Sequence, residues 1–202
     1  ALEVCIFSPP EDGLWTYACE VARRQPIAVW TTNPEEAIFE YEEIYVRRCY
    51  FPKDVSMIQA TLERFLQSPR PKVVVDAGMN LGLFTRFAWE VFESSTSLTC
   101  LAFEPAPDVF QMAVRGCEES GMPVSVHLTP PTAALQVGQV HCFQLALSQT
   151  SSVQRFTHFP ESPANSALTQ HSPEARWPAG QVPEKIELEV TCCRLSDILG
   201  DL

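Results

Sequence analysis

In the middle of the chain the spacing of apolar residues changes from a continuous run to a helical repeat. Lys72 to Val75 is a short β-branched run, typical of a strand buried on both faces. Asp76-Ala77-Gly78 interrupts it, and apolar residues recur at helical spacing from Asn80 onward. The pattern predicts a strand, a glycine-bearing turn and a helix with Asn80 as its N-cap. Since the first turn of such a helix has unpaired N–H groups, we expect Gly78 and Gly82 to let a ligand approach the backbone.

A second strand and helix follow the first. Leu98 to Phe103 is predicted to be a buried strand that ends at Glu104. Glu104 lies roughly 20 residues beyond the glycine turn, and in mononucleotide-binding folds an acidic side chain at this distance holds a ribose diol. Pro105 ends the strand and permits a helix over Ala106 to Glu119. The two units predict an α/β fold with a doubly wound, mostly parallel sheet. A plain βαβ unit, with glycines that serve packing and a solvated Glu104, is the alternative left open.

The downstream part of the chain shows further strand patterns. Val124–Leu128, Val140–Leu147 and Ile186–Cys193 are predicted strands, and Val153–Phe159 alternates as a hairpin partner does. Pro160–Pro183 is rich in proline, serine, alanine and glutamine, and is predicted to be a mobile loop over the site.

Residues 1–71 are predicted to form a helical cap in front of a core at 72–202. Helical spacing predicts helices over Leu14–Gln25 and Ser56–Gln67. The acidic segment Glu35–Tyr45 between them is amphipathic.

The net charge limits the range of partners. The 202 residues include 25 acidic and 14 basic ones, a formal net charge of −11. Binding to phosphate backbones or to an acidic membrane surface requires clustered lysine and arginine, so neither nucleic acid nor a membrane is an expected partner. The acidic surface fits a neutral or cationic substrate better than a phosphate-rich one.

The eight cysteines show no C-x-x-C pair, which removes the usual zinc and redox signatures, and no metal site is expected. Most of them fall in predicted buried elements. They are therefore interpreted as small buried hydrophobes of a reducing, cytoplasmic compartment.

The ordered series VVVDAGMNLGLFT, LAFEPAPDVF, QLALSQTSSVQRF, NSAL and VTCCRLSDIL resembles the FkbM family of S-adenosylmethionine-dependent methyltransferases. The preceding EYEEIYVRRCYF is similar to the lead-in of members built into polyketide and nonribosomal peptide assembly lines. The resemblance implies a Rossmann-like class I methyltransferase fold. The family continues into a K-I-D-x-E-G strand that this chain lacks, and we expect the sequence to be trimmed before those C-terminal strands.

The resemblance also implies a set of cofactor-binding residues. Those of the glycine turn would line the methionine and ribose part, Glu104 would hold the ribose hydroxyls, and the rest would lie around the adenine. The full set is Asp76, Gly78, Asn80, Gly82, Glu104, Pro105, Ala106, Ala146, Leu147 and Ser148. Met79 and Gln149 depart from the family, which has alanine and aspartate at these places.

The function so implied is O-methylation of a hydroxyl on a small metabolite, sugar or carrier-tethered intermediate, with S-adenosylhomocysteine as product. A hydroxyl acceptor needs a base, and the candidates are His127, His141, His158 and His171. His141 begins a buried strand and is expected to be a satisfied core residue. His158 lies where a substrate-facing hairpin is expected, and is the predicted catalytic base.

Two other functions remain open. A nicotinamide-dependent oxidoreductase would use the same half-sheet, but the turn lacks the G-x-G-x-x-G pattern that receives a pyrophosphate. A methyltransferase-like docking module without activity would need none of these contacts. The sequence gives no indication of oligomeric state.

Overall fold

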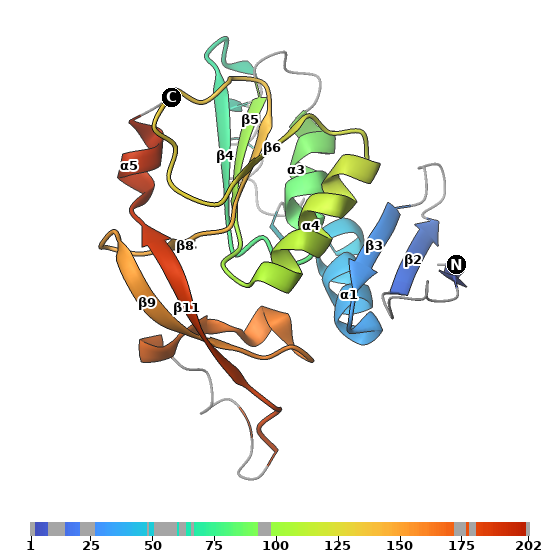
Figure 1. Cartoon of the computed structure of the whole chain (residues 1–202). Helices are drawn as coiled ribbons and strands as arrows, with labels where there is room; N and C mark the ends of the chain where they lie inside the picture. Colours follow the sequence, from blue (N-terminus) through green and yellow to red (C-terminus); the bar gives the residue numbers. More distant parts are fainter. Residues whose placement is uncertain are drawn as a thin grey trace.

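The computed structural model describes residues 3–7, 15–20, 27–47, 49–50, 60, 64–65, 67–92, 98–171, 177 and 181–200. At its centre lies a four-stranded parallel sheet (Figure 1). Its strand order is β4-β5-β7-β6. Its strands are β4 (Lys72–Ala77), β5 (Leu98–Phe103), β7 (Val140–Phe143) and β6 (Val124–His127). The apolar runs predicted to be buried strands form this sheet, and the expected α/β class is confirmed.

Helices cover both faces of the sheet. The apolar sides of α3 (Leu83–Phe92) and α4 (Pro107–Glu119) pack on one face (Figure 1). The other face packs against α5 (Leu195–Leu199) and against Leu135 from the connection between β6 and β7. Among the described residues, Cys49 is exposed, which the prediction of buried cysteines did not expect, and the others with a known environment are buried as predicted: Cys100, Cys117, Cys142, Cys192 and Cys193.

A second, mixed sheet has the order β10-β9-β11-β8. It contains β8 (Ala146–Leu147), β9 (Ser152–His158), β10 (Ala167–Leu168) and β11 (Ile186–Cys193). The single strand predicted over Val140–Leu147 is therefore wrong. The chain leaves the parallel sheet after Phe143, and Ala146–Leu147 pairs instead with Cys192–Cys193 of β11.

The segment expected to be a loop after Pro160 has regular structure in its described part. A 3-10 turn η2 (Pro163–Asn165), strand β10 and a second 3-10 turn η3 (Thr169–His171) follow one another. Strand β10 pairs antiparallel with β9, at Leu168 opposite Phe156.

The N-terminal cap is not purely helical. Strands β1 (Glu3–Phe7), β2 (Trp15–Glu20) and β3 (Ile27–Thr31) form an antiparallel sheet, so the helix predicted over Leu14–Gln25 is wrong at 15–20. The short apolar run WTYACE fits helical and alternating periods alike, and strand pairing decides between them.

The acidic amphipathic segment does form a helix. Asn33 caps α1 (Pro34–Tyr41) by accepting from the N–H groups of Glu35 and Glu36, and a π-helical turn η1 (Glu42–Val46) continues it. Of the helix predicted over Ser56–Gln67, Ala60, Arg64, Phe65 and Gln67 are helical, and the remainder lies outside the described residues. No helix of the described part is long and apolar enough to cross a membrane.

Candidate functional site

The glycine turn after β4 lies beside the end of β5, because the register pairs Ala77 with Phe103. The N–H groups of Gly78 and Met79 both donate to the Phe103 carbonyl, over 2.9 and 2.8 Å. Gly78 has φ +88°, and a Cβ built on it meets nothing within 4 Å. This backbone therefore favours glycine and faces open space, and the approach of a ligand to it stays a prediction.

Gly82 has a different reason to be glycine. Its φ is +74°, and a Cβ there would lie 3.3 Å from the Ala113 carbonyl oxygen and 3.4 Å from Cys117 Sγ, both on α4. The absent side chain lets α3 pack closely on α4. For this glycine the packing explanation holds, and its cofactor contact stays a prediction.

Asp76 stabilises the start of α3. Its Oδ2 accepts from Thr85 Oγ1 over 2.6 Å, in the first turn of the helix. Burial raises the pKa of Asp76 to about 6, and the hydrogen bonds from Thr85 lower it.

Asn80 is not the N-cap of α3, since the helix begins three residues later and Asn80 has φ +42°. Its backbone N–H donates to Glu104 Oε2 over 3.2 Å, and its Nδ2 donates to Glu40 Oε1. The side chain thus points to α1 rather than along α3.

A cavity of about 460 Å³ lies between α1 and the glycine turn. Acidic and amide side chains from both elements line it, and the described lining contains no lysine, arginine or histidine. The polar side chains are those of Glu36, Glu40, Glu43, Tyr50, Asp76 and Asn80. Burial raises the pKa of Glu40 to about 8, and the nearby carboxyls of Glu36, Asp76 and Glu104 add to this.

Glu104 is buried at the end of β5, so it is not the solvated residue of the plain βαβ alternative. Its Oε1 accepts from the N–H of Ala106 over 3.0 Å and its Oε2 from that of Asn80, which ties the two turns together. Burial raises the pKa of Glu104 to about 7, although these two hydrogen bonds lower it. Pro105 and Ala106 are buried next to it.

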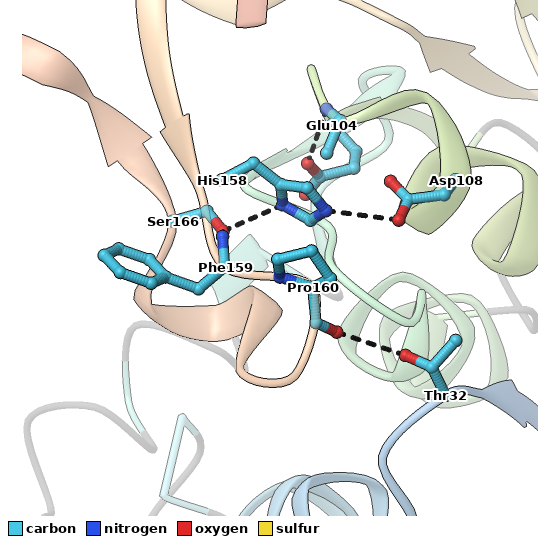
Figure 2. Close-up of polar contacts among 8 residues, drawn as sticks. Thr32, Glu104, Asp108, His158, Phe159, Pro160 and Ser166 are labelled. Atoms are coloured by element: carbon cyan, nitrogen blue, oxygen red, sulfur yellow. Dashed lines mark hydrogen bonds and ion pairs between the residues drawn. The ribbon is translucent and has the colours of Figure 1, made fainter. Parts of the chain in front are cut away.

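His158, the predicted base, lies buried at the end of β9 beside Glu104 (Figure 2). Its Nε2 is 3.1 Å from Asp108 Oδ2 and its Nδ1 is 3.1 Å from Ser166 Oγ. The N–H of Phe159 also donates to Ser166 Oγ, over 3.0 Å. One assignment satisfies this chain: Ser166 donates its hydroxyl to Nδ1, and Nε2–H donates to Asp108. That hydrogen bond lowers the pKa of Asp108.

The residues predicted from the third strand lie elsewhere. Leu147 and Ser148 line a separate cavity of about 1040 Å³, which shares no lining residue with the acidic one. Its lining has amide, hydroxyl and aliphatic side chains and no ionisable group. Ala146 is buried in the core. The structure thus brings together Asp76, Gly78, Asn80 and Glu104, but not Leu147 and Ser148 with them.

The other histidines within the described part do not form a metal centre. His127 Nε2 is 3.0 Å from His141 Nδ1, and His141 Nε2 is 2.8 Å from the Gln136 carbonyl oxygen. His141 is buried with both nitrogens bonded, which confirms it as a satisfied core residue. Among the described residues, no three His, Cys, Asp or Glu side chains are grouped to hold a metal ion.

Sequence reasoning missed Glu36, Glu40 and Asp108 as parts of the site. A signal for the first two was present, because Glu36, Glu40 and Glu43 recur at i, i+4 and i+7, on one face of the amphipathic helix. Nothing in the sequence indicates that this face lies over the glycine turn.

No family model matches the chain, and no solved structure matches it. Among curated proteins it is similar to "Methyltransferase 1" of Beauveria bassiana (strain ARSEF 2860), at 29% identity over 175 residues, which cover 83% of this chain and 58% of the relative. It is also similar to "Methyltransferase sdnD" of Sordaria araneosa, at 26% identity over 149 residues, which cover 74% of this chain and 46% of the relative. The chain therefore spans about half the length of the curated relatives it matches.

Proposed function

We propose that the chain provides the cofactor-binding part of an S-adenosylmethionine-dependent methyltransferase of the FkbM type, with a class I Rossmann-like core. The observation that carries the proposal is the open backbone of Gly78, which lines a cavity beside two strand ends that also carry Asp76 and Glu104. Similarity to two proteins named methyltransferase supports it.

The residues present fit this cofactor. S-adenosylmethionine has a ribose diol, an ammonium and a sulfonium, and it has no phosphate. Carboxylates accept hydrogen bonds from the diol and the ammonium and favour positive charge, whereas a pyrophosphate would be repelled by them. A volume of about 460 Å³ is within the usual range of small-molecule sites.

When bound, the cofactor supplies an activated methyl group, so the protein's own task is to bind, orient and exclude water. Under the proposal Glu104 holds the ribose hydroxyls and Gly78 permits close approach of the ligand. Asp76 positions the turn through Thr85. The acceptor proposed is a hydroxyl of a small metabolite, sugar or carrier-tethered intermediate.

Titration calorimetry with S-adenosylhomocysteine tests the proposal. The protein is expected to bind it and not NAD, and Gly78→Ala is expected to lower the affinity at least about 10-fold because a Cβ enters the cavity. Gly121→Ala is the matched control, since Gly121 has φ +74°, open space around its Cβ and no place in the cavity lining. Each substitution is expected to cost about 1–2 kcal/mol of stability through backbone strain. Binding of NAD instead would support an oxidoreductase, and binding of neither ligand a docking module.

A further inference from the structure

The acidic cavity beneath α1 contains more hydrogen-bond acceptors than donors. Asn80 is 9% exposed, yet its Oδ1 has no hydrogen-bond partner among the described residues. Glu36 accepts from the N–H of Ala164 through Oε1 over 2.7 Å, while its buried Oε2 has no such partner either. Buried polar atoms are normally bonded, so these two oxygens need an explanation.

The third acceptor is the carboxyl of Glu40, and its surroundings are unfavourable for a negative charge. Its neighbours come from several elements: its own helical segment, the end of β4, the glycine turn, the end of β5 and the chain after η1. In that order they are Glu36 and Glu43, Asp76, Asn80, Glu104 and Tyr50. None of these groups is cationic. A carboxylate in such a place is stabilised by a ligand that brings positive charge.

We infer that this cavity binds a primary ammonium group, held by Glu40, Glu36 and Asn80. An ammonium has three N–H donors, one for each of these three acceptors. Its positive charge is balanced by the carboxylate of Glu40. A sulfonium has the charge but no donor, so it leaves the two orphaned oxygens unsatisfied. The inference rests on the proposed function, under which the group is the ammonium at the aminoacyl end of the cofactor, and α1 supplies its counter-charge.

Calorimetry with a pair of ligands isolates this contact. S-adenosylhomocysteine carries the ammonium, and its deamino analogue, in which hydrogen replaces the amino group, lacks it. The wild-type protein is expected to bind S-adenosylhomocysteine about 10- to 100-fold more tightly than the analogue. Glu40→Gln is expected to remove most of this difference by weakening only the first ligand.

Glu35→Gln is the matched control. It removes the same charge from the same helix, but Glu35 is exposed and does not line the cavity. It is expected to leave both affinities within about twofold of the wild type.

Proton release gives an independent readout. Because Glu40 has a pKa of about 8 in the free protein, its carboxyl is largely protonated at pH 7, and an ammonium ligand favours the ionised form. Calorimetry in two buffers of different ionisation enthalpy is expected to show release of protons on binding, reduced in Glu40→Gln.

The outcomes separate the two proposals. If the wild type binds neither ligand, the proposed function fails. If it binds both with equal affinity, or if Glu40→Gln weakens both equally, the cofactor assignment survives and the ammonium site does not.

Discussion

The polar groups around the strand ends fall into two regions with opposite character. Beneath α1, Asn80 Oδ1 and Glu36 Oε2 are buried without a partner in the described residues, and Glu40 has a strongly raised pKa. A short distance away, Glu104 and His158 are equally buried, but both carboxylate oxygens and both ring nitrogens are hydrogen-bonded within the protein.

This difference separates ligand binding from stability. Substitution of a group whose hydrogen-bond partners all lie within the protein is expected to lower mainly the stability of the fold, because it leaves those buried partners unsatisfied. Substitution of a group that has no hydrogen-bond partner in the folded protein is expected to lower mainly the affinity for the ligand that supplies the missing partner. Glu104 belongs to the first region by its contacts and to the second by its proposed ribose contact, so it is the sharpest test of the division.

Glu104→Gln is expected to have the largest effect. The amide presents N–H groups to one of the two backbone donors, which costs about 1–3 kcal/mol and lowers the melting temperature by several degrees. The affinity for S-adenosylhomocysteine is expected to fall about 10- to 100-fold in calorimetry. Glu119→Gln is the control, since the Glu119 carboxylate also accepts two hydrogen bonds, here from the side chains of Trp30 and Arg115, and lies on α4 away from the glycine turn.

The pH dependence of Glu104→Gln provides a second check. The pKa of Glu104 is raised to about 7 in the folded protein, so the folded state binds this proton more tightly than the unfolded state. Its contribution to stability is complete below about pH 4.5 and is lost as the pH rises through 7. Thermal unfolding of the wild type is expected to show this decline, and Glu104→Gln to reduce it. An unchanged slope would contradict the assignment.

His158→Gln is expected to have an intermediate effect, confined to stability. Glutamine can place an amide N–H where Nε2 donates to Asp108, but it has no acceptor at the position of Nδ1, where Ser166 donates. About 1 kcal/mol of stability and about 2–4 °C in melting temperature are therefore expected to be lost. Under the proposed function, methyl transfer to a hydroxyl acceptor is expected to keep its rate and its pH profile. The reason is that the lone pair of Nδ1 already accepts from Ser166, so we propose that His158 positions the hairpin beside Glu104.

If His158 is instead the catalytic base, as the sequence predicts, the same substitution is expected to lower the rate of methyl transfer. A lost general base lowers the rate by about 10²–10⁴ and removes a titration from the pH profile, with cofactor affinity unchanged. Because the hydrogen bonds of His158 are lost under either role, the rate and its pH profile distinguish the two roles.

The parallel sheet could be predicted from the sequence because its residues carry a local signal. Leu98–Phe103 was expected as a strand with the bounds it has, since six apolar or β-branched residues end at a glutamate and a proline. Asn80 was misplaced because N-cap preference is local, whereas Glu40 and Glu104 fix its orientation from distant parts of the chain. The acidic face of α1 was visible as a pattern, but its position over the glycine turn depends on packing between elements.

The same limit explains the third strand. The mostly apolar run VHCFQLAL predicts one continuous strand. In the structure the chain passes from the parallel sheet to the mixed sheet at Gln144 and Leu145. Where a strand leaves its sheet depends on the partner that becomes available, here Cys192–Cys193 of β11. Leu147 and Ser148 therefore line a different cavity from the glycine turn, and the adenine contact implied for Ala146–Ser148 by the family resemblance stays a prediction.

Ser148→Ala is expected to have the smallest effect and tests whether the two cavities are separate. Ser148 Oγ accepts from Gln154 Nε2 over 3.0 Å, and the side chain lines only the cavity without ionisable groups. Loss of this partly exposed hydrogen bond is expected to cost less than about 0.5 kcal/mol and to change the affinity for S-adenosylhomocysteine less than about threefold. A tenfold loss of affinity would mean that β8 closes over the ligand when it binds. The two regions would then form one site, and unsatisfied acceptors alone would no longer identify where the ligand lies.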